Sequence, residues 1–112
     1  MKLPTASQLI TVHDVLVERW GGEGGFYDHA NGAGVVESAL YTAATAVEVE
    51  GLSVFEAAAL LGAYLLTSHP FLDGNKRTAA SSILAVLEAN KVSLTASPRR
   101  LFEKIVSLQR AT

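Results

Sequence analysis

Residues 53–68 read SVFEAAALLGAYLLTS and contain the longest apolar run of the 112-residue chain, Ala57 to Leu66. Ser53 followed three residues later by Glu56 matches a capping box, so we predict that a helix begins there. It should end near Ser68, because the residue that precedes Pro70 is disfavoured in helical geometry. A helix that is apolar on nearly every side belongs in the middle of a bundle.

The segments on either side of this run are also predicted to be helical. A first helix is predicted to be capped by Ser7 and to end at Gly21 and Gly22. Its apolar residues and one histidine recur at helical spacing: Leu9, Ile10, His13, Leu16 and Trp20. A glycine-rich loop over residues 21–34 and a short helix over 35–40 follow. A further helix starts at residues 74–76 and ends at Asn90, and Ser97 with Pro98 predicts the start of a last one. We therefore expect a single all-α domain spanning residues 1–112.

One short segment departs from the helical pattern. Residues 46–51 read AVEVEG and alternate apolar and acidic side chains, which is the period of a β-strand. The segment is too short to form a sheet. We expect it to form a small flap or hairpin edge, where a target segment could add as a strand.

Composition excludes several classes of protein. The chain has no cysteine, which excludes a disulfide scaffold, a thiol nucleophile and a thiolate zinc site. Its net charge is −2 and no dense basic run is present, so no direct contact with nucleic acid is expected. The apolar run is roughly half of the ~20 residues that a membrane helix needs. With no signal-like segment at Met1, we expect a cytoplasmic protein without a membrane partner.

The residues with chemical potential lie together in residues 69–77, HPFLDGNKR. This loop leads into the start of a helix, where unpaired backbone N–H groups and the helix dipole form an anion site. Gly74 permits close approach of a phosphate, Asn75 adds an amide donor, and Lys76 and Arg77 add positive charge. Two cations in the first turn of a helix oppose its dipole unless a bound anion offsets them.

Two further residues of the same loop suit chemistry on a bound phosphate. Asp73 is a hard oxygen ligand of the kind that Mg²⁺ prefers. His69 can act as a general base near neutral pH. The segment thus predicts a magnesium-dependent phosphate site with its own base.

Residues 69–77 resemble the HxFx(D/E)GN(K/G)R signature of the Fic/Doc superfamily at every specified position. Lys76 in place of glycine, followed by RTA, resembles the Doc (death-on-curing) branch. The resemblance implies an all-α Fic/Doc bundle and a transferase that uses ATP and Mg²⁺ to modify a hydroxyl of a target protein. It assigns the base to His69, the Mg²⁺ ligand to Asp73 and phosphate binding to Gly74, Asn75, Lys76 and Arg77.

The Doc branch implies a toxin of a toxin–antitoxin system. Such toxins are kinases that phosphorylate a Ser or Thr hydroxyl of a translation factor, elongation factor Tu, and a protein antitoxin neutralises them. The alternatives are AMP transfer, as in Fic proteins with glycine at position 76, and a non-catalytic module that binds a partner. Ala80 occupies the position where adenylyltransferases carry a second arginine, which disfavours AMP transfer. Ala46 replaces the hydroxyl residue of the usual inhibitory motif, so control by a separate antitoxin is expected.

The remaining histidines and two aromatic residues are expected to have structural roles. His13 lies at helical spacing among apolar residues, so we expect a packed and hydrogen-bonded ring that could support the motif. His29 is expected on a surface loop. Trp20 and Tyr64 are expected in the core.

Overall fold

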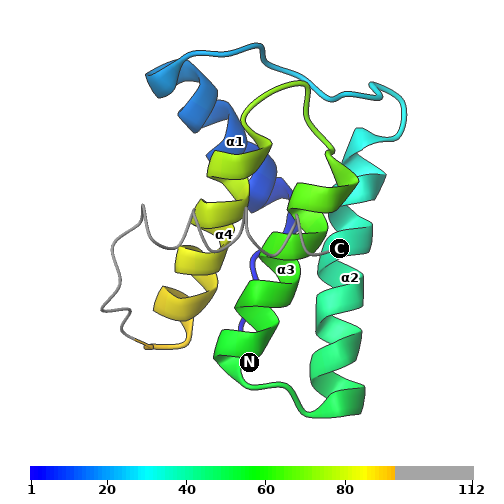
Figure 1. Ribbon diagram of the computed structural model, residues 1–112, viewed down its shortest axis with the longest axis vertical. Coiled ribbons are helices and arrows are strands. Elements are labelled where there is room, and N and C mark those ends of the chain that lie inside the picture. Colours follow the sequence, from blue (N-terminus) through cyan, green and yellow to red (C-terminus); the bar gives the residue numbers. More distant parts are fainter. Residues whose placement is uncertain (93–112) are drawn as a thin grey trace.

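The computed structural model describes residues 1–92, which form four α-helices joined by loops (Figure 1). The helices are α1 (Ala6–Trp20), α2 (Gly32–Glu50), α3 (Val54–Ser68) and α4 (Asn75–Ala89). No strand occurs in this part of the chain, which confirms the predicted all-α class. The helix predicted after Ser97 and Pro98 lies outside the described residues. Within residues 1–92, no helix is both long and apolar enough to cross a bilayer.

Helix α3 lies between α2 and α4 and supplies much of the core, as its sequence predicts (Figure 1). Its capping box is present: the Ser53 hydroxyl accepts a hydrogen bond from the Glu56 N–H at 3.1 Å, and the Glu56 carboxylate accepts one from the Ser53 N–H at 3.1 Å. The helix ends at Ser68, before Pro70, as predicted. Six of its residues are buried: Ala57, Ala58, Leu61, Gly62, Leu65 and Leu66.

Helix α1 begins earlier than the sequence indicated. The N-cap is Thr5 and not Ser7, because Thr5 and Gln8 form a reciprocal capping box. The Thr5 hydroxyl accepts from the Gln8 N–H at 3.1 Å, and the Gln8 side chain accepts from the Thr5 N–H at 2.9 Å. A glutamine three residues after a threonine therefore decides where this helix starts.

The predicted flap at residues 46–51 is wrong, because α2 continues through it to Glu50. The buried residues Val36, Ala39 and Ala43 form a stripe that half-buried Ala46 and Val47 extend at helical spacing. Packing of this stripe against the bundle overrides the strand-like alternation of six residues. The helix also begins at Gly32, so the preceding loop is shorter than the predicted residues 21–34.

Two loops that are distant in the sequence meet at one end of the bundle (Figure 1). The α1–α2 loop and the α3–α4 loop are joined by two backbone hydrogen bonds. The Tyr27 N–H donates to the Pro70 carbonyl at 3.0 Å, and the Leu72 N–H donates to the Gly25 carbonyl at 3.1 Å. This pairing holds the loop that starts residues 69–77 against the α1–α2 loop.

Candidate functional site

A pocket of about 530 Å³ lies where the end of α1 meets the α3–α4 loop and the start of α4. A volume of this size is typical of small-molecule sites. The pocket is lined by all six site residues predicted from the sequence, His69, Asp73, Gly74, Asn75, Lys76 and Arg77, together with Trp20, Gly21, Gly22 and Leu72.

The N-terminus of α4 is built to receive an anion. Its N-cap is Gly74, in the left-handed region at φ 79°, and no side chain caps the helix. The Thr78 N–H is the first that bonds back to the Gly74 carbonyl, at 2.9 Å, so the three N–H groups before it have no helical partner. Exposed Lys76 and Arg77 form no ion pair with a described carboxylate, and no acidic residue lies in the first turn.

Asp73 places a carboxylate at the edge of this helix start. One of its oxygens accepts a hydrogen bond from the Gly74 N–H at 2.9 Å. The other lies 2.7 Å from the point where a Cβ on Gly22 would stand, so only glycine permits this approach of the α1–α2 loop. No group of three or more potential metal ligands is found in residues 1–92. A single exposed carboxylate beside a phosphate site fits Mg²⁺ that is shared with substrate phosphates, not a cage made by protein alone.

His69 lies at the C-cap of α3 and faces the same pocket. Its backbone is left-handed, with φ 53° and ψ 57°, a conformation in which glycine would be unstrained. The side chain is exposed, and its ring meets the ring of Tyr27 edge-on with centroids 6.1 Å apart. An accessible imidazole at this point can take a proton from a substrate hydroxyl near the anion site.

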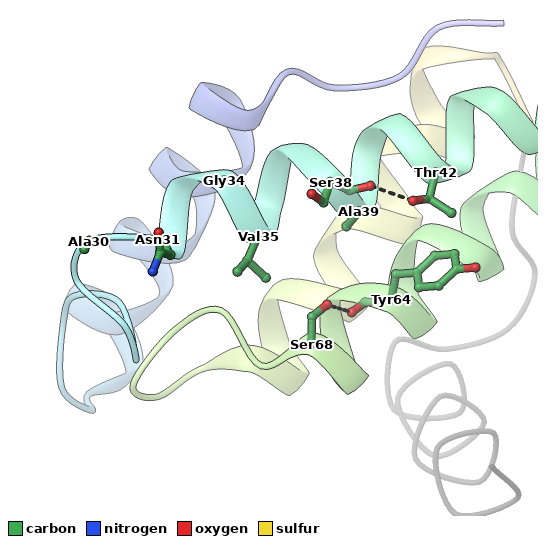
Figure 2. A pocket seen from close by; sticks show the side chains of 9 residues that line it. All are labelled: Ala30, Asn31, Gly34, Val35, Ser38, Ala39, Thr42, Tyr64 and Ser68. Atoms are coloured by element: carbon green, nitrogen blue, oxygen red, sulfur yellow. Dashed lines mark hydrogen bonds between the residues drawn. The ribbon is translucent and has the colours of Figure 1, made fainter.

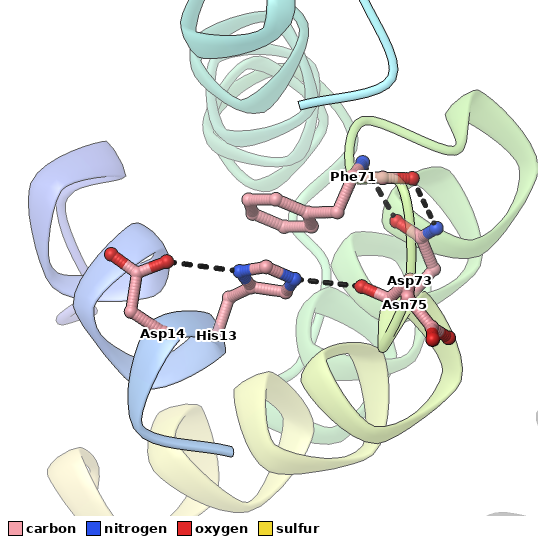
Figure 3. A network of polar contacts seen from close by, with 5 residues as sticks. All are labelled: His13, Asp14, Phe71, Asp73 and Asn75. Atoms are coloured by element: carbon pink, nitrogen blue, oxygen red, sulfur yellow. Dashed lines mark hydrogen bonds and ion pairs between the residues drawn. The ribbon is translucent and has the colours of Figure 1, made fainter. Parts of the chain in front are cut away.

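Asn75 uses its side-chain amide to close the loop (Figure 3). The amide oxygen accepts from the Phe71 N–H at 3.1 Å, and the amide nitrogen donates to the Phe71 carbonyl at 2.8 Å. Asn75 is buried, with 5% of its surface exposed. One of its two side-chain N–H groups is thus occupied within the loop, and its backbone N–H, at the first position of α4, is a donor available to a phosphate.

His13 on α1 contacts the α3–α4 loop, and its predicted packed and hydrogen-bonded state is confirmed (Figure 3). The ring is fully buried and stacks on Phe71, with centroids 3.6 Å apart and planes 7° from parallel. Its Nε2 lies 2.7 Å from the Asp73 carbonyl oxygen and its Nδ1 lies 3.1 Å from an Asp14 carboxylate oxygen. Since a carbonyl oxygen only accepts, the His13 Nε2–H donates to the Asp73 carbonyl. This bond fixes the backbone between Asp73, the candidate metal ligand, and the start of α4.

Trp20 was predicted in the core, and the structure overturns this: 62% of its surface is exposed, and it lines the pocket. The same prediction for Tyr64 is also wrong, since 37% of its surface is exposed. The available signal for Trp20 was its place directly before Gly21 and Gly22, not its helical spacing. It lies seven residues after His13, two turns further along the same face of α1, where the helix ends at Gly21 and the core has ended. His29 is exposed on the α1–α2 loop, as predicted.

A second pocket of about 490 Å³ lies between α2 and α3 (Figure 2). Its walls carry hydroxyl and amide groups, and several of its hydroxyls are occupied within the protein. The Thr42 hydroxyl donates to the Ser38 carbonyl at 2.8 Å, and the Ser68 hydroxyl donates to the Tyr64 carbonyl. None of the described residues that line this pocket is charged. It lacks the means to neutralise a phosphate, so the pocket beside His69 is the candidate site.

Comparison with known proteins identifies the same region. The model of a family described as the Fic/DOC family matches residues 3–87, a range that includes the whole of residues 69–77. A protein of Escherichia phage P1 named "Protein kinase doc" is 33% identical over 99 residues, which cover 88% of this chain and 75% of that protein.

Proposed function

Because this chain belongs to the Fic/DOC family, in its Doc branch, we propose that it is a Doc-like protein kinase that transfers the γ-phosphate of ATP to a Ser or Thr hydroxyl. The observation that carries the proposal is the pocket at the start of α4, which combines an uncapped helix N-terminus, two cations that pair with no carboxylate of residues 1–92, one carboxylate and one accessible imidazole. The printed name of the phage relative, a protein kinase, supports phosphoryl transfer.

Each group has a defined part in such a reaction. The backbone N–H groups at the start of α4 bind phosphate oxygens, and Lys76 and Arg77 balance their charge. Asp73 would hold Mg²⁺, which would supply neutralisation of the phosphate charge. His69 accepts the proton of the substrate hydroxyl as its oxygen bonds to the γ-phosphorus. The bond from that phosphorus to the bridging oxygen breaks, and ADP leaves. Phosphoryl transfer needs mainly such positioning and charge stabilisation.

Further parts of the proposal rest on the family. The substrate is a translation factor of the elongation factor Tu type, and the biological role is that of a toxin. A separate protein antitoxin controls it. Among the described residues, the segment 46–51 is part of a regular helix and carries Ala46 at the position where an inhibitory hydroxyl is expected, which agrees with control from outside the chain.

Residue 80 favours phosphate transfer over AMP transfer. Position 80 holds alanine, whose half-buried methyl group packs against the core and provides no guanidinium. The second arginine that would hold the outer phosphates for AMP transfer is thus missing from α4. Lys76 occupies the position of the glycine found in AMP-transferring relatives.

The test uses the purified chain, elongation factor Tu and ATP labelled in either the α- or the γ-phosphate. We expect label from γ-labelled ATP on the target, and a mass increase equal to one phosphate. His69→Ala should lower the rate at least about 100-fold, because loss of a general base typically costs 10²–10⁴ in rate. His29→Ala, which changes an exposed loop histidine, is the matched control and should keep the wild-type rate. Transfer of the α-label would refute the kinase proposal, and equal rates for wild type and His69→Ala would refute the base assignment.

A further inference from the structure

The apolar end of the pocket has no part in the chemistry described above. Trp20 is the last residue of α1 and the only tryptophan of the chain. Although its ring is large and apolar, 62% of its surface is exposed. Leu72, which lines the same pocket, is 46% exposed. An exposed apolar surface of this kind within a concave site indicates a surface that a ligand covers.

The pocket is therefore divided into two chemically distinct parts. One part consists of the α4 start and its charged side chains, and suits phosphates. The other is the side chain of Trp20, which supplies an aromatic ring and carries no charge itself. A nucleotide has the same division, with charged phosphates at one end and an aromatic base at the other.

Arg77 links these two parts. Its guanidinium carbon lies 5.8 Å from the centroid of the Trp20 ring, within the range of a cation–π contact. A guanidinium that lies over an aromatic ring keeps its N–H edge available for phosphate oxygens. The ring thus orients Arg77 toward the phosphate site, and a part of the Trp20 ring remains exposed for a second stacked group.

We propose that Trp20 is the stacking platform for the base of the nucleotide whose phosphates bind at the start of α4. This rests on the proposed function, and it adds the residue that recognises the base, so that the nucleotide is held through its aromatic base and not only through its phosphates. Aromatic stacking on a base is sequence-tolerant because every base has a π-face. The site should consequently favour nucleotides over inorganic polyphosphate while discriminating weakly among bases.

The chain carries its own reporter for this contact. Because Trp20 is the only tryptophan, its fluorescence reports stacking directly. In the presence of Mg²⁺, ATP should quench the emission of the full chain, whereas inorganic tripolyphosphate, which lacks a base, should leave it nearly unchanged. Quenching of the same size by tripolyphosphate would refute base stacking.

Calorimetry on variants separates the base from the phosphates. Trp20→Ala should weaken ATP binding about tenfold, a typical loss for one base stacked on an aromatic ring, and change tripolyphosphate binding less than about twofold. Trp20→Phe should restore most of the ATP affinity. The matched control is Phe55→Ala, which removes an aromatic ring that is 55% exposed and does not line the pocket. This variant should bind ATP and tripolyphosphate as the wild type does.

The remaining outcomes are also decisive. Equal loss of ATP and tripolyphosphate affinity in Trp20→Ala would show that the ring acts only by orienting Arg77. Unchanged ATP affinity would show that it covers another surface, such as one for the protein substrate. Wild-type binding of tripolyphosphate as tight as that of ATP would refute the base platform and leave the phosphate site standing. If the wild type binds neither, the proposed function itself fails, and this inference with it.

Discussion

The buried amide of Asn75 provides a quantitative test of how the site loop is held. Replacing it by alanine removes two hydrogen bonds and leaves the N–H and carbonyl groups of Phe71 without partners. Phe71 is 1% exposed, so water does not readily replace the lost amide. Each unsatisfied buried group costs about 1–3 kcal/mol. We expect Asn75→Ala to lower the free energy of unfolding by about 2–6 kcal/mol, the sum for two such groups, measured by urea denaturation.

Asn90 provides a matched control for this prediction. Its side-chain amide makes the same pair of bonds to one residue, accepting from the Lys2 N–H at 2.8 Å and donating to the Lys2 carbonyl at 2.8 Å. It makes one bond more than Asn75, because it also donates to the Val86 carbonyl at 2.8 Å, a group that keeps the Asn90 N–H as a partner when the side chain is removed. Lys2 is exposed, so water can satisfy its backbone groups when the amide is removed. We expect Asn90→Ala to cost about 0.5–1.5 kcal/mol, the usual net value of such bonds. Equal losses for the two variants would refute the argument that burial, and not the number of bonds, sets the cost.

Three further predictions concern the site and the helix starts. Arg77→Ala should weaken ATP binding about tenfold or more by removing a charged phosphate contact. Asp73→Asn should reduce the dependence of ATP binding on Mg²⁺. Calorimetry with and without Mg²⁺ measures both effects, and unchanged affinities would contradict the roles assigned to Arg77 and Asp73. The pKa of Glu56 is lowered from its ordinary value of 4.5, first by the Ser53 N–H and then by the Ser53 hydroxyl, so its stabilising effect is complete above about pH 4.5 and is lost as the pH falls through the lowered pKa. Glu56→Gln should make the unfolding free energy less sensitive to acid over that range, and an identical pH profile would count against the capping contribution. Lys76→Gly should increase the ratio of AMP to phosphate transferred, read by mass spectrometry of the target, whereas a slower kinase with no AMP product would show that Lys76 does not select the transferred group.

The sequence determined the features that depend on neighbours along the chain. The helix of residues 54–68 follows from the Ser53–Glu56 capping box and from Pro70, because both act within one helical turn. The site residues of 69–77 were predictable together, since a loop that ends in a helix start places its glycine, cations and carboxylate near one set of unpaired N–H groups. Local signals of this kind do not need the rest of the fold.

Only the tertiary structure decided the features that join distant segments. Helix α2 passes through residues 46–51 because its apolar stripe packs against the bundle, and a six-residue alternation cannot outweigh that burial. His13 reaches the Asp73 carbonyl across 60 residues, a contact that no local pattern encodes. Trp20 has the spacing of a core residue, yet it is the last residue of α1, where 62% of its surface is exposed and it forms part of the pocket wall. A helical period reports which face a residue occupies, while the neighbours on that face are set by the packing of the whole chain.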